Sequence, residues 1–198
     1  MRVTPLSLGA KLTPVSVWEW GADMQFRTGK VFIAIAIAMA MGLSFYKAAA
    51  ADDDRETCKT ASGDAAIAAC TRAIDSKKYS KKKFKRTLSL LYTNRGVEYE
   101  IKKEFDKAIA DHDAAIKIDP KNWAAYNNRG NAYAGKGDYD HAIADYDTAI
   151  KLNPKYAEAF YNRGLAKRKK GDAAGADADI AQAKELQPGI GSTGSTGQ

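Results

Sequence analysis

The triplet Asn-Arg-Gly occurs three times in this chain, starting at residues 94, 128 and 162. The copies are therefore 34 residues apart, and an aspartate follows each arginine after 16 residues. If that interval forms a helical hairpin, the two side chains meet across it as an ion pair, with the arginine stem packing as an aliphatic chain. We interpret these pairs as structural rather than catalytic: Arg95 with Asp111, Arg129 with Asp145, and Arg163 with Asp179.

The burial of these pairs decides what they contribute to stability. Replacing a buried pair by apolar side chains can be nearly neutral, whereas removing one partner can cost about 3–5 kcal/mol. From the sequence alone we expect that Arg129→Leu is tolerated and that Asp145→Ala is destabilising.

A basic run over residues 77–86 is the second candidate for chemistry. Seven of its ten residues are Lys or Arg, in a chain with 31 basic and 24 acidic residues and a formal charge of +7. Such a run is typical of an anion-binding patch for nucleic acid, an acidic envelope polymer or a phospholipid surface, or else of a solvated linker. No stacking platform of aromatic residues accompanies it, so specific nucleic-acid recognition is not expected. The candidates are Lys77, Lys78, Lys81, Lys82, Lys83, Lys85 and Arg86.

Catalytic and metal-ligating patterns are absent from the sequence. His112 occupies the position of Tyr146 in the next copy and is interpreted as a core residue, while His141 is placed on an exposed helical turn. We find no cluster of His, Cys and acids at metal-ligand spacing, no glycine-rich phosphate loop and no nucleophile motif. We therefore predict a protein that is not an enzyme and that has no cofactor and no metal.

A repeating helical unit must position the three triplets. The segments 87–120, 121–154 and 155–188 are each 34 residues long and end in proline. In the second segment, Gly137 stops one helix and Asp138 caps the next. Pro154 ends the second helix, because the residue before a proline is pushed out of the helical region. Each segment is predicted to be a hairpin of two helices.

This pattern resembles the tetratricopeptide repeat family over residues 87–188. The second copy has the family's small residue, aromatic residue, two alanines and final proline at the matching spacings: Gly130, Tyr133, Ala142, Ala149 and Pro154. The resemblance implies an all-α, right-handed superhelical array of antiparallel helix pairs that binds other proteins. The third copy departs from the pattern at Lys167, Ala173 and Gly175. Because a glycine inside a helix costs roughly 1 kcal/mol relative to alanine, we expect this copy to be the loosest.

A partial copy over residues 52–76 precedes the three full ones. Gly63-Asp64 parallels Gly137-Asp138, although the following residues are short by two. The two cysteines of the chain, Cys58 and Cys70, fall on its two helices. In an exported protein they are expected to form a disulfide that holds together a unit too small to be stable alone. The alternative is a pair of buried free thiols.

The asparagine of each triplet is predicted to belong to a binding wall. One residue of a helix turns by about 100°, so Asn94, Asn128 and Asn162 point away from the arginines. In the family that this chain resembles, first helices line a concave wall that accepts extended peptides, and an amide there can both donate and accept hydrogen bonds. The alternative is that each asparagine satisfies its own helix or loop. The same wall would carry Thr93, Val97, Asn127, Asn131, Tyr161 and Leu165.

One peptide-binding mode of the family, the carboxylate clamp for C-terminal peptides, is not supported. The clamp requires basic residues where this chain has Thr93 and Glu158, and an asparagine where it has Val97. We therefore do not expect partners of that class.

The first 51 residues are interpreted as a targeting segment. Arg27 and Lys30 precede an uncharged run over 31–45, and small residues up to Ala51 follow it, which is the order of a secretory signal peptide. Residues 24–51 are then the signal, cut after Ala51 or one residue earlier, and 1–23 are an over-extended start. The less favoured alternative is an uncleaved membrane anchor, since the apolar run is shorter than the ~20 residues that span a bilayer.

The sequence therefore predicts a periplasmic or secreted, non-catalytic scaffold that binds a protein or peptide partner in its concave groove. The alternative is an envelope attachment or assembly factor that uses the run 77–86 on an anionic surface. Residues 189–198 are predicted to be a flexible tail without a capping helix. An open last helix would allow a homodimer, which is the third alternative.

Overall fold

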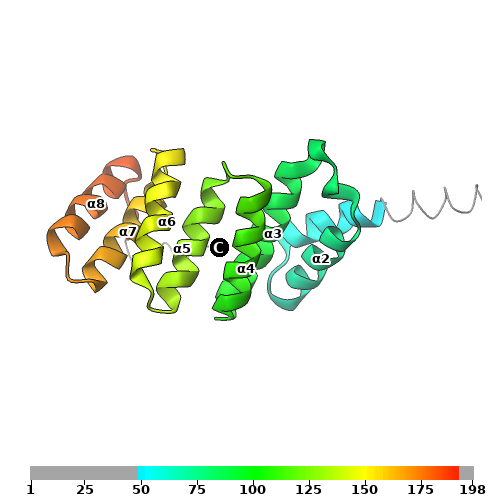
Figure 1. Cartoon of the computed structure of the whole chain (residues 1–198), viewed down its shortest axis with the longest axis horizontal. Coiled ribbons are helices and arrows are strands. Elements are labelled where there is room, and N and C mark those ends of the chain that lie inside the picture. Colours follow the sequence, from blue (N-terminus) through cyan, green and yellow to red (C-terminus); the bar gives the residue numbers. More distant parts are fainter. Residues whose placement is uncertain (1–48, 192–198) are drawn as a thin grey trace, which may run out of the picture. The chain divides into compact units, whose positions relative to one another are not determined.

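A computed structural model of the chain describes residues 49–191. The predicted extension 1–23, the signal peptide up to residue 48 and the tail from residue 192 onward lie outside the described residues. Between residues 49 and 191 every regular element is a helix, and consecutive helices lie side by side (Figure 1). The predicted fold class, an all-α array of antiparallel helix pairs, is confirmed.

The helix bounds follow the predicted hairpins closely. Residues 49–60 are helical and pair with α2 (Gly63–Asp75), and two short 3-10 helices come next, η1 (Lys78–Ser80) and η2 (Lys82–Phe84). The three full hairpins are α3 (Lys85–Ile101) with α4 (Phe105–Ile118), α5 (Trp123–Gly135) with α6 (Tyr139–Leu152), and α7 (Ala157–Lys169) with α8 (Ala173–Leu186).

The turns inside the hairpins show why the helices end where they do. Gly137 has φ +84° and Gly171 has φ +90°, a left-handed conformation that glycine adopts without steric cost. The aspartate after each glycine caps the second helix, since Asp138 accepts a hydrogen bond from the His141 amide and Asp172 from the Gly175 amide.

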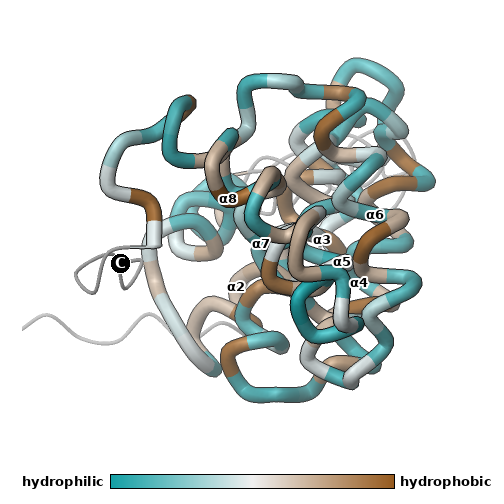
Figure 2. The backbone as a smooth tube through the Cα atoms, turned by 90° about the vertical axis from the view of Figure 1, so that its left-hand side faces the viewer, coloured by the Kyte–Doolittle hydropathy of each residue, from teal (hydrophilic) through white to brown (hydrophobic). Residues whose placement is uncertain are grey.

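Small residues allow the two helices of each hairpin to approach closely. The glycine of each triplet lies against the ring or branched side chain of the opposite helix, and a Cβ on Gly130 would stand 2.7 Å from the ring of Tyr146. The Ala142 carbonyl of α6 would lie 3.1 Å from the same Cβ, and both Ala142 and Ala149 are fully buried. Hydrophobic residues alternate with hydrophilic ones along the helices (Figure 2), so each helix buries only a stripe.

The third hairpin keeps its geometry despite its departures from the pattern. Gly175 lies in the first turn of α8, where its amide donates to Asp172 Oδ1 at 2.9 Å, so the cost of a glycine in a helix interior does not apply in full. Lys167, which replaces the aromatic residue of the first helix, places Nζ 2.9 Å from Asp179 Oδ2. One departure thus adds an ion pair to this hairpin.

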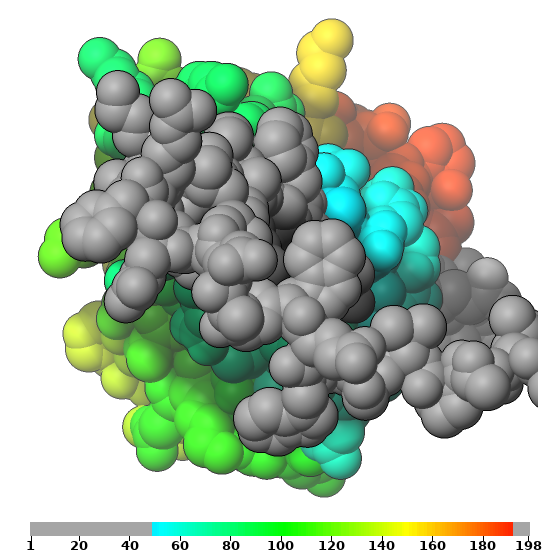
Figure 3. Space-filling view, turned by 90° about the vertical axis from the view of Figure 1, so that its right-hand side faces the viewer, coloured from blue at the N-terminus to red at the C-terminus, as the bar shows by residue number. Residues whose placement is uncertain are grey.

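The partial repeat is joined to α3 through a buried cluster. Cys58 and Cys70 form a disulfide, and both cysteines are buried. In the basic run, Tyr79 is buried too, and its hydroxyl donates to Asp52 Oδ1 at 2.7 Å and to the Ala51 carbonyl at 3.1 Å. The run is therefore anchored to the helix over 49–60, at the end of the array seen in Figure 3.

The residues after α8 turn back onto the last hairpin. Ile190 is only 7% exposed and packs with Ala157 and Ala183, next to Tyr161. Ile190 follows Pro188 as Tyr156 follows Pro154 and Asn122 follows Pro120, at the repeat interval of 34 residues. The described start of the tail, residues 189–191, thus continues the path of the repeat and covers part of its last helices.

Candidate functional site

The first helices of the successive repeats, 49–60, α3, α5 and α7, carry all six residues predicted to bind a peptide. Besides its hairpin partner, α5 contacts both α3 and α7. Asn94 lies on α3, Asn127, Asn128 and Asn131 on α5, and Tyr161 and Asn162 on α7. We call this surface the first-helix face.

Most asparagines of this face bind one another. Asn162 Nδ2 donates to Asn127 Oδ1 at 3.2 Å and to Asn131 Oδ1 at 3.1 Å, which connects α7 to α5. Asn127 Nδ2 donates to Asn128 Oδ1 at 3.2 Å, and the Tyr146 hydroxyl donates to Asn131 Oδ1 at 2.9 Å. The amides therefore satisfy each other between neighbouring repeats. The sequence left two kinds of hydrogen-bond partner open for these asparagines, a bound peptide or their own helix or loop. The structure shows a third, the asparagines of the neighbouring repeat.

The network leaves a defined set of hydrogen-bonding groups for a ligand. Asn127 is only 2% exposed, and both its donor and its acceptor are used. It therefore holds Asn128 and Asn162 in place and is not itself available to a ligand. Among the described residues, the groups without a side-chain partner are Nδ2 of Asn128, Nδ2 of Asn131, Oδ1 of Asn162 and the whole amide of Asn94. Tyr161 is half-buried beneath the turn at residues 190–191.

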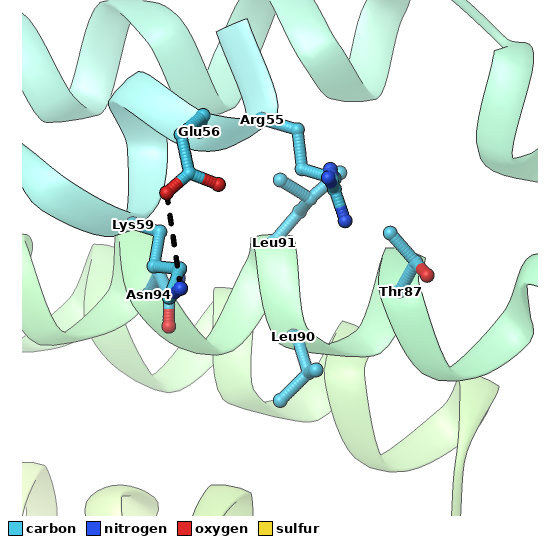
Figure 4. Close-up of a pocket in the computed structure, with 7 residues that line it drawn as sticks. All are labelled: Arg55, Glu56, Lys59, Thr87, Leu90, Leu91 and Asn94. Carbon is cyan, nitrogen blue, oxygen red and sulfur yellow. Dashed lines mark ion pairs between the residues drawn. The ribbon is translucent and has the colours of Figure 1, made fainter. Parts of the chain in front are cut away.

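Two cavities beside this face are lined by its asparagines, and a third, lined by Tyr161 and Leu165, lies between α7, α8 and the turn at residues 190–191. One of the first two, of about 240 Å³, lies between the helix 49–60 and α3, and Figure 4 shows Asn94, Thr87 and Arg55 around it. The other, of about 300 Å³, lies between α5, α6 and α7 and is lined by Asn131, Asn162 and Leu165 among others. Each of these two cavities therefore combines amide groups with apolar surface, which suits a polypeptide.

The arginine of each triplet lies between its own repeat and the preceding one. In the second repeat, Nε and Nη2 of Arg129 contact the two carboxylate oxygens of Asp145 at 2.7 and 2.6 Å, while Nη1 contacts Asp113 Oδ1 at 2.5 Å. Arg163 binds Asp179 and Asp147 in the same way, whereas Arg95 binds Asp111 and the Thr71 hydroxyl.

Sequence reasoning missed the second acid of these networks. Asp113 and Asp147 stand 16 residues before Arg129 and Arg163, just as the predicted partners stand 16 residues after them. A search for acids on both sides of each arginine would have found them. The consequence is that these arginines tie consecutive repeats together as well as closing their own hairpins.

Burial and charge tune the acids in these networks. Burial alone would raise the pKa of Asp179, but hydrogen bonds and charge from Arg163 and Lys167 outweigh it and hold that pKa below its ordinary value. The hydrogen bond to Asp145 is the largest cause that raises the pKa of Arg129. The pair of Arg163 with Asp179 therefore stays ionised throughout the neutral range.

The first repeat holds a buried polar pair where the second has apolar contact. His112 is fully buried on α4, and its Nε2 lies 2.7 Å from Glu100 Oε1. In the second repeat the corresponding residues are Tyr146 and Ala134. Burial raises the pKa of Glu100, although the hydrogen bond with His112 opposes this. The folded protein thus binds a proton at Glu100 more readily than the unfolded chain does.

Replacing Glu100 by Ala and His112 by Phe is expected to stabilise the first repeat. The Tyr146 ring shows that a six-membered ring fits at this position, and replacing a buried polar pair by apolar residues is worth about 1–3 kcal/mol. Because the pKa of Glu100 is raised on folding, wild-type stability falls as pH rises above the ordinary value of 4.5. In urea unfolding at pH 4–6, the free energy of unfolding of the double variant should exceed that of the wild type by an amount that grows with pH. His112→Phe alone leaves Glu100 unpaired, and a gain from that single change would contradict this account.

The basic run presents most of its charges to solvent. Six of its seven basic residues are exposed, while Lys78 is half-buried and pairs with Asp52. In the part of the chain between residues 49 and 191, no helix is long and apolar enough to cross a membrane, and no three His, Cys or acidic side chains form a metal site.

Together these features define a helical-repeat protein whose first helices present a face lined with amide side chains. Models of the TPR repeat match residues 96–137 and 130–171, and a model of the tetratricopeptide repeat matches residues 157–190. The chain is a tetratricopeptide repeat protein. The matches leave the partial repeat at residues 52–76 outside the family pattern.

Solved structures with the same fold include the first and second TPR domains of Spaghetti (RPAP3), each bound to the HSP90 peptide SRMEEVD. They are 28% and 26% identical to this chain, with TM-scores of 0.50 and 0.52. The alignments cover 50% and 54% of this chain and 79% and 97% of the domains. The TPR domain of OM64 from Arabidopsis is 26% identical over 52% of this chain and 86% of that domain, with a TM-score of 0.51. No curated protein matches the sequence.

Proposed function

We propose that this protein is a non-catalytic scaffold that holds an extended segment of a partner protein along the first-helix face. The observation that carries the proposal is that asparagines of this face line two cavities, Asn94 in one and Asn131 with Asn162 in the other, and that each of these amides still has a free donor or acceptor. A peptide backbone offers matching N–H and C=O groups at regular intervals. Because the amides on α5 and α7 are already fixed by one another, these side chains lose little entropy on binding.

The similar Spaghetti domains bind a peptide, which supports this class of partner. That particular peptide is not carried over to this chain. Thr93, Val97 and Glu158 stand at positions where the clamp for C-terminal carboxylates requires two basic residues and an asparagine. We therefore propose that this protein recognises the backbone and the side chains of its partner segment. It does not require the C-terminal carboxylate of a peptide.

A random library of 12-residue peptides with blocked ends, selected on the purified protein, tests the groove. Selected peptides should bind roughly 30-fold more weakly when Asn94, Asn128 and Asn162 are all replaced by Ala, because each hydrogen bond contributes about 0.5–1.5 kcal/mol. Gln182→Ala is the matched control, since it removes an exposed amide from α8. Equal binding by the triple variant, with helicity unchanged by circular dichroism, would exclude the groove.

The proposal places the protein in the periplasm or outside the cell. The disulfide supports this, because disulfides persist in oxidising compartments and are rare in the cytosol. The intact mass of protein taken from a periplasmic extract tests it. Cleavage after Ala51 or Ala50 is expected, whereas a mass that includes residues 31–45 would favour the membrane anchor.

Attachment to an anionic surface is the second candidate function. The observation that favours it is the exposure of Lys77, Lys81, Lys82 and Lys83 on short turns that Tyr79 anchors. Vesicles containing anionic lipid should bind the protein at low salt and release it as salt screens the charges. Binding that persists at high salt, or that survives replacement of these lysines by Gln, would exclude this mode.

A further inference from the structure

The cavity at Asn94 has one wall that belongs to none of the three full repeats. The helix over 49–60 contributes Arg55, Glu56 and Lys59, which face Leu90 and Asn94 of α3 across the cavity (Figure 4). The other cavity lined by asparagines has Lys169 as its one charged lining residue. The N-terminal end of this face can therefore select a ligand by its charge. The middle of the face, with a single charged lining residue, is less able to do so.

Cations outnumber acids in this cavity. Within residues 49–191, the Arg55 side chain makes neither an ion pair nor a hydrogen bond, and the Lys59 ammonium pairs only with Glu56, at 3.8 Å. The Lys59 and Glu56 side chains are 70% and 57% exposed, and an exposed pair of this kind contributes little to stability. Both cations are thus available to a carboxylate, and Lys59 can exchange its partner at little cost.

The spacing of the two cations matches an extended peptide. Arg55 and Lys59 are four residues apart on one helix face, about 6 Å along the axis. In an extended segment, side chains two residues apart point the same way and lie roughly 6.6 Å apart. Acidic side chains at such positions can meet the two cations one to one. The side chain between them points the opposite way, toward α3, where Leu90 is 45% exposed.

We propose that this cavity binds an extended segment with the pattern acidic–apolar–acidic. The two carboxylates pair with Arg55 and Lys59, the apolar side chain covers Leu90, and the amide of Asn94 hydrogen-bonds the peptide backbone. This inference rests on the proposed peptide-binding function and specifies the sequence recognised at one end of the face. The acids are side chains within the segment, so a free C-terminus is not required.

Three labelled peptides with blocked ends test the pattern, with Glu-Leu-Glu, Gln-Leu-Gln or Glu-Ser-Glu flanked by Gly and Ser. Fluorescence anisotropy at 0.15 M salt should show the first binding roughly tenfold more tightly than either other peptide. The double variant Arg55→Gln/Lys59→Gln should lose the preference for Glu over Gln. Lys117→Gln/Lys151→Gln is the matched control, because it removes the same charge from exposed positions on α4 and α6.

The outcomes separate this inference from the proposed function. Retention of the preference for Glu by the Arg55/Lys59 variant, or its loss in the control variant, would show general attraction to a basic protein and overturn the inference. Equal binding of the three peptides, or binding of none, would overturn it too. Asparagine-dependent binding of library peptides would still support the groove in those cases, and its absence would remove both.

Discussion

Arg129→Leu is expected to lower the free energy of unfolding by about 3 kcal/mol. The change leaves the Asp145 carboxylate without a partner, and its side chain is only 9% exposed. An ionised carboxylate that is buried and unpaired is costly because it cannot recover its hydration. The sequence alone led us to expect that this substitution is tolerated, and the burial of the aspartate reverses that expectation.

Asp145→Ala should cost less, about 1–2 kcal/mol. The Arg129 side chain is 21% exposed, and it keeps its contact with Asp113 after the aspartate is lost. The double variant should be no less stable than Arg129→Leu alone, because it removes both charges. Urea unfolding followed by circular dichroism measures all three variants. If the two single changes cost the same, or if the double variant is the least stable, the asymmetry argued here is wrong.

Reduction of the disulfide should release the helix over 49–60 from the array. The bridge joins residues 12 positions apart, and closing a loop of this size is worth about 3 kcal/mol. The remaining contacts of this short helix lie near its first residues, where Tyr79 binds Asp52 and the Ala51 carbonyl, and in the pair of Arg72 with Asp54, whose arginine is exposed. Amide hydrogen exchange of residues 49–75 should therefore become faster after reduction.

The effect of reduction is expected to stay local. Each repeat contacts only its neighbours, so α5 to α8 should keep their protection. The variant Cys58→Ala/Cys70→Ala should exchange rapidly at residues 49–60 with or without reductant. Reduction should also remove binding of the Glu-Leu-Glu peptide, since Arg55 and Lys59 lie on the released helix. Unchanged protection after both thiols have been titrated would contradict the stabilising role of the bridge.

The sequence by itself determined the helices and their pairing. The 34-residue period fixes where each hairpin begins and ends, and glycine, aspartate and proline act on the residues beside them. The arginine–aspartate pairs across a hairpin follow from the same local spacing, as does the close crossing at Gly130. These features need only neighbouring helices, so a pattern within one repeat is enough to predict them.

Only the tertiary structure decided what the first-helix face offers to a ligand. Asn127 and Asn162 are 35 residues apart and meet because α5 packs against α7. The asparagines that the sequence predicts as a row of unpaired amides are therefore hydrogen-bonded to one another. The arginine bridges to Asp113 and Asp147 likewise join separate repeats, and the cavity at Asn94 exists because the helix over 49–60 packs beside α3. Contacts between repeats depend on how far each hairpin is rotated relative to the next. That rotation results from many side chains packing together, and no local sequence pattern encodes it.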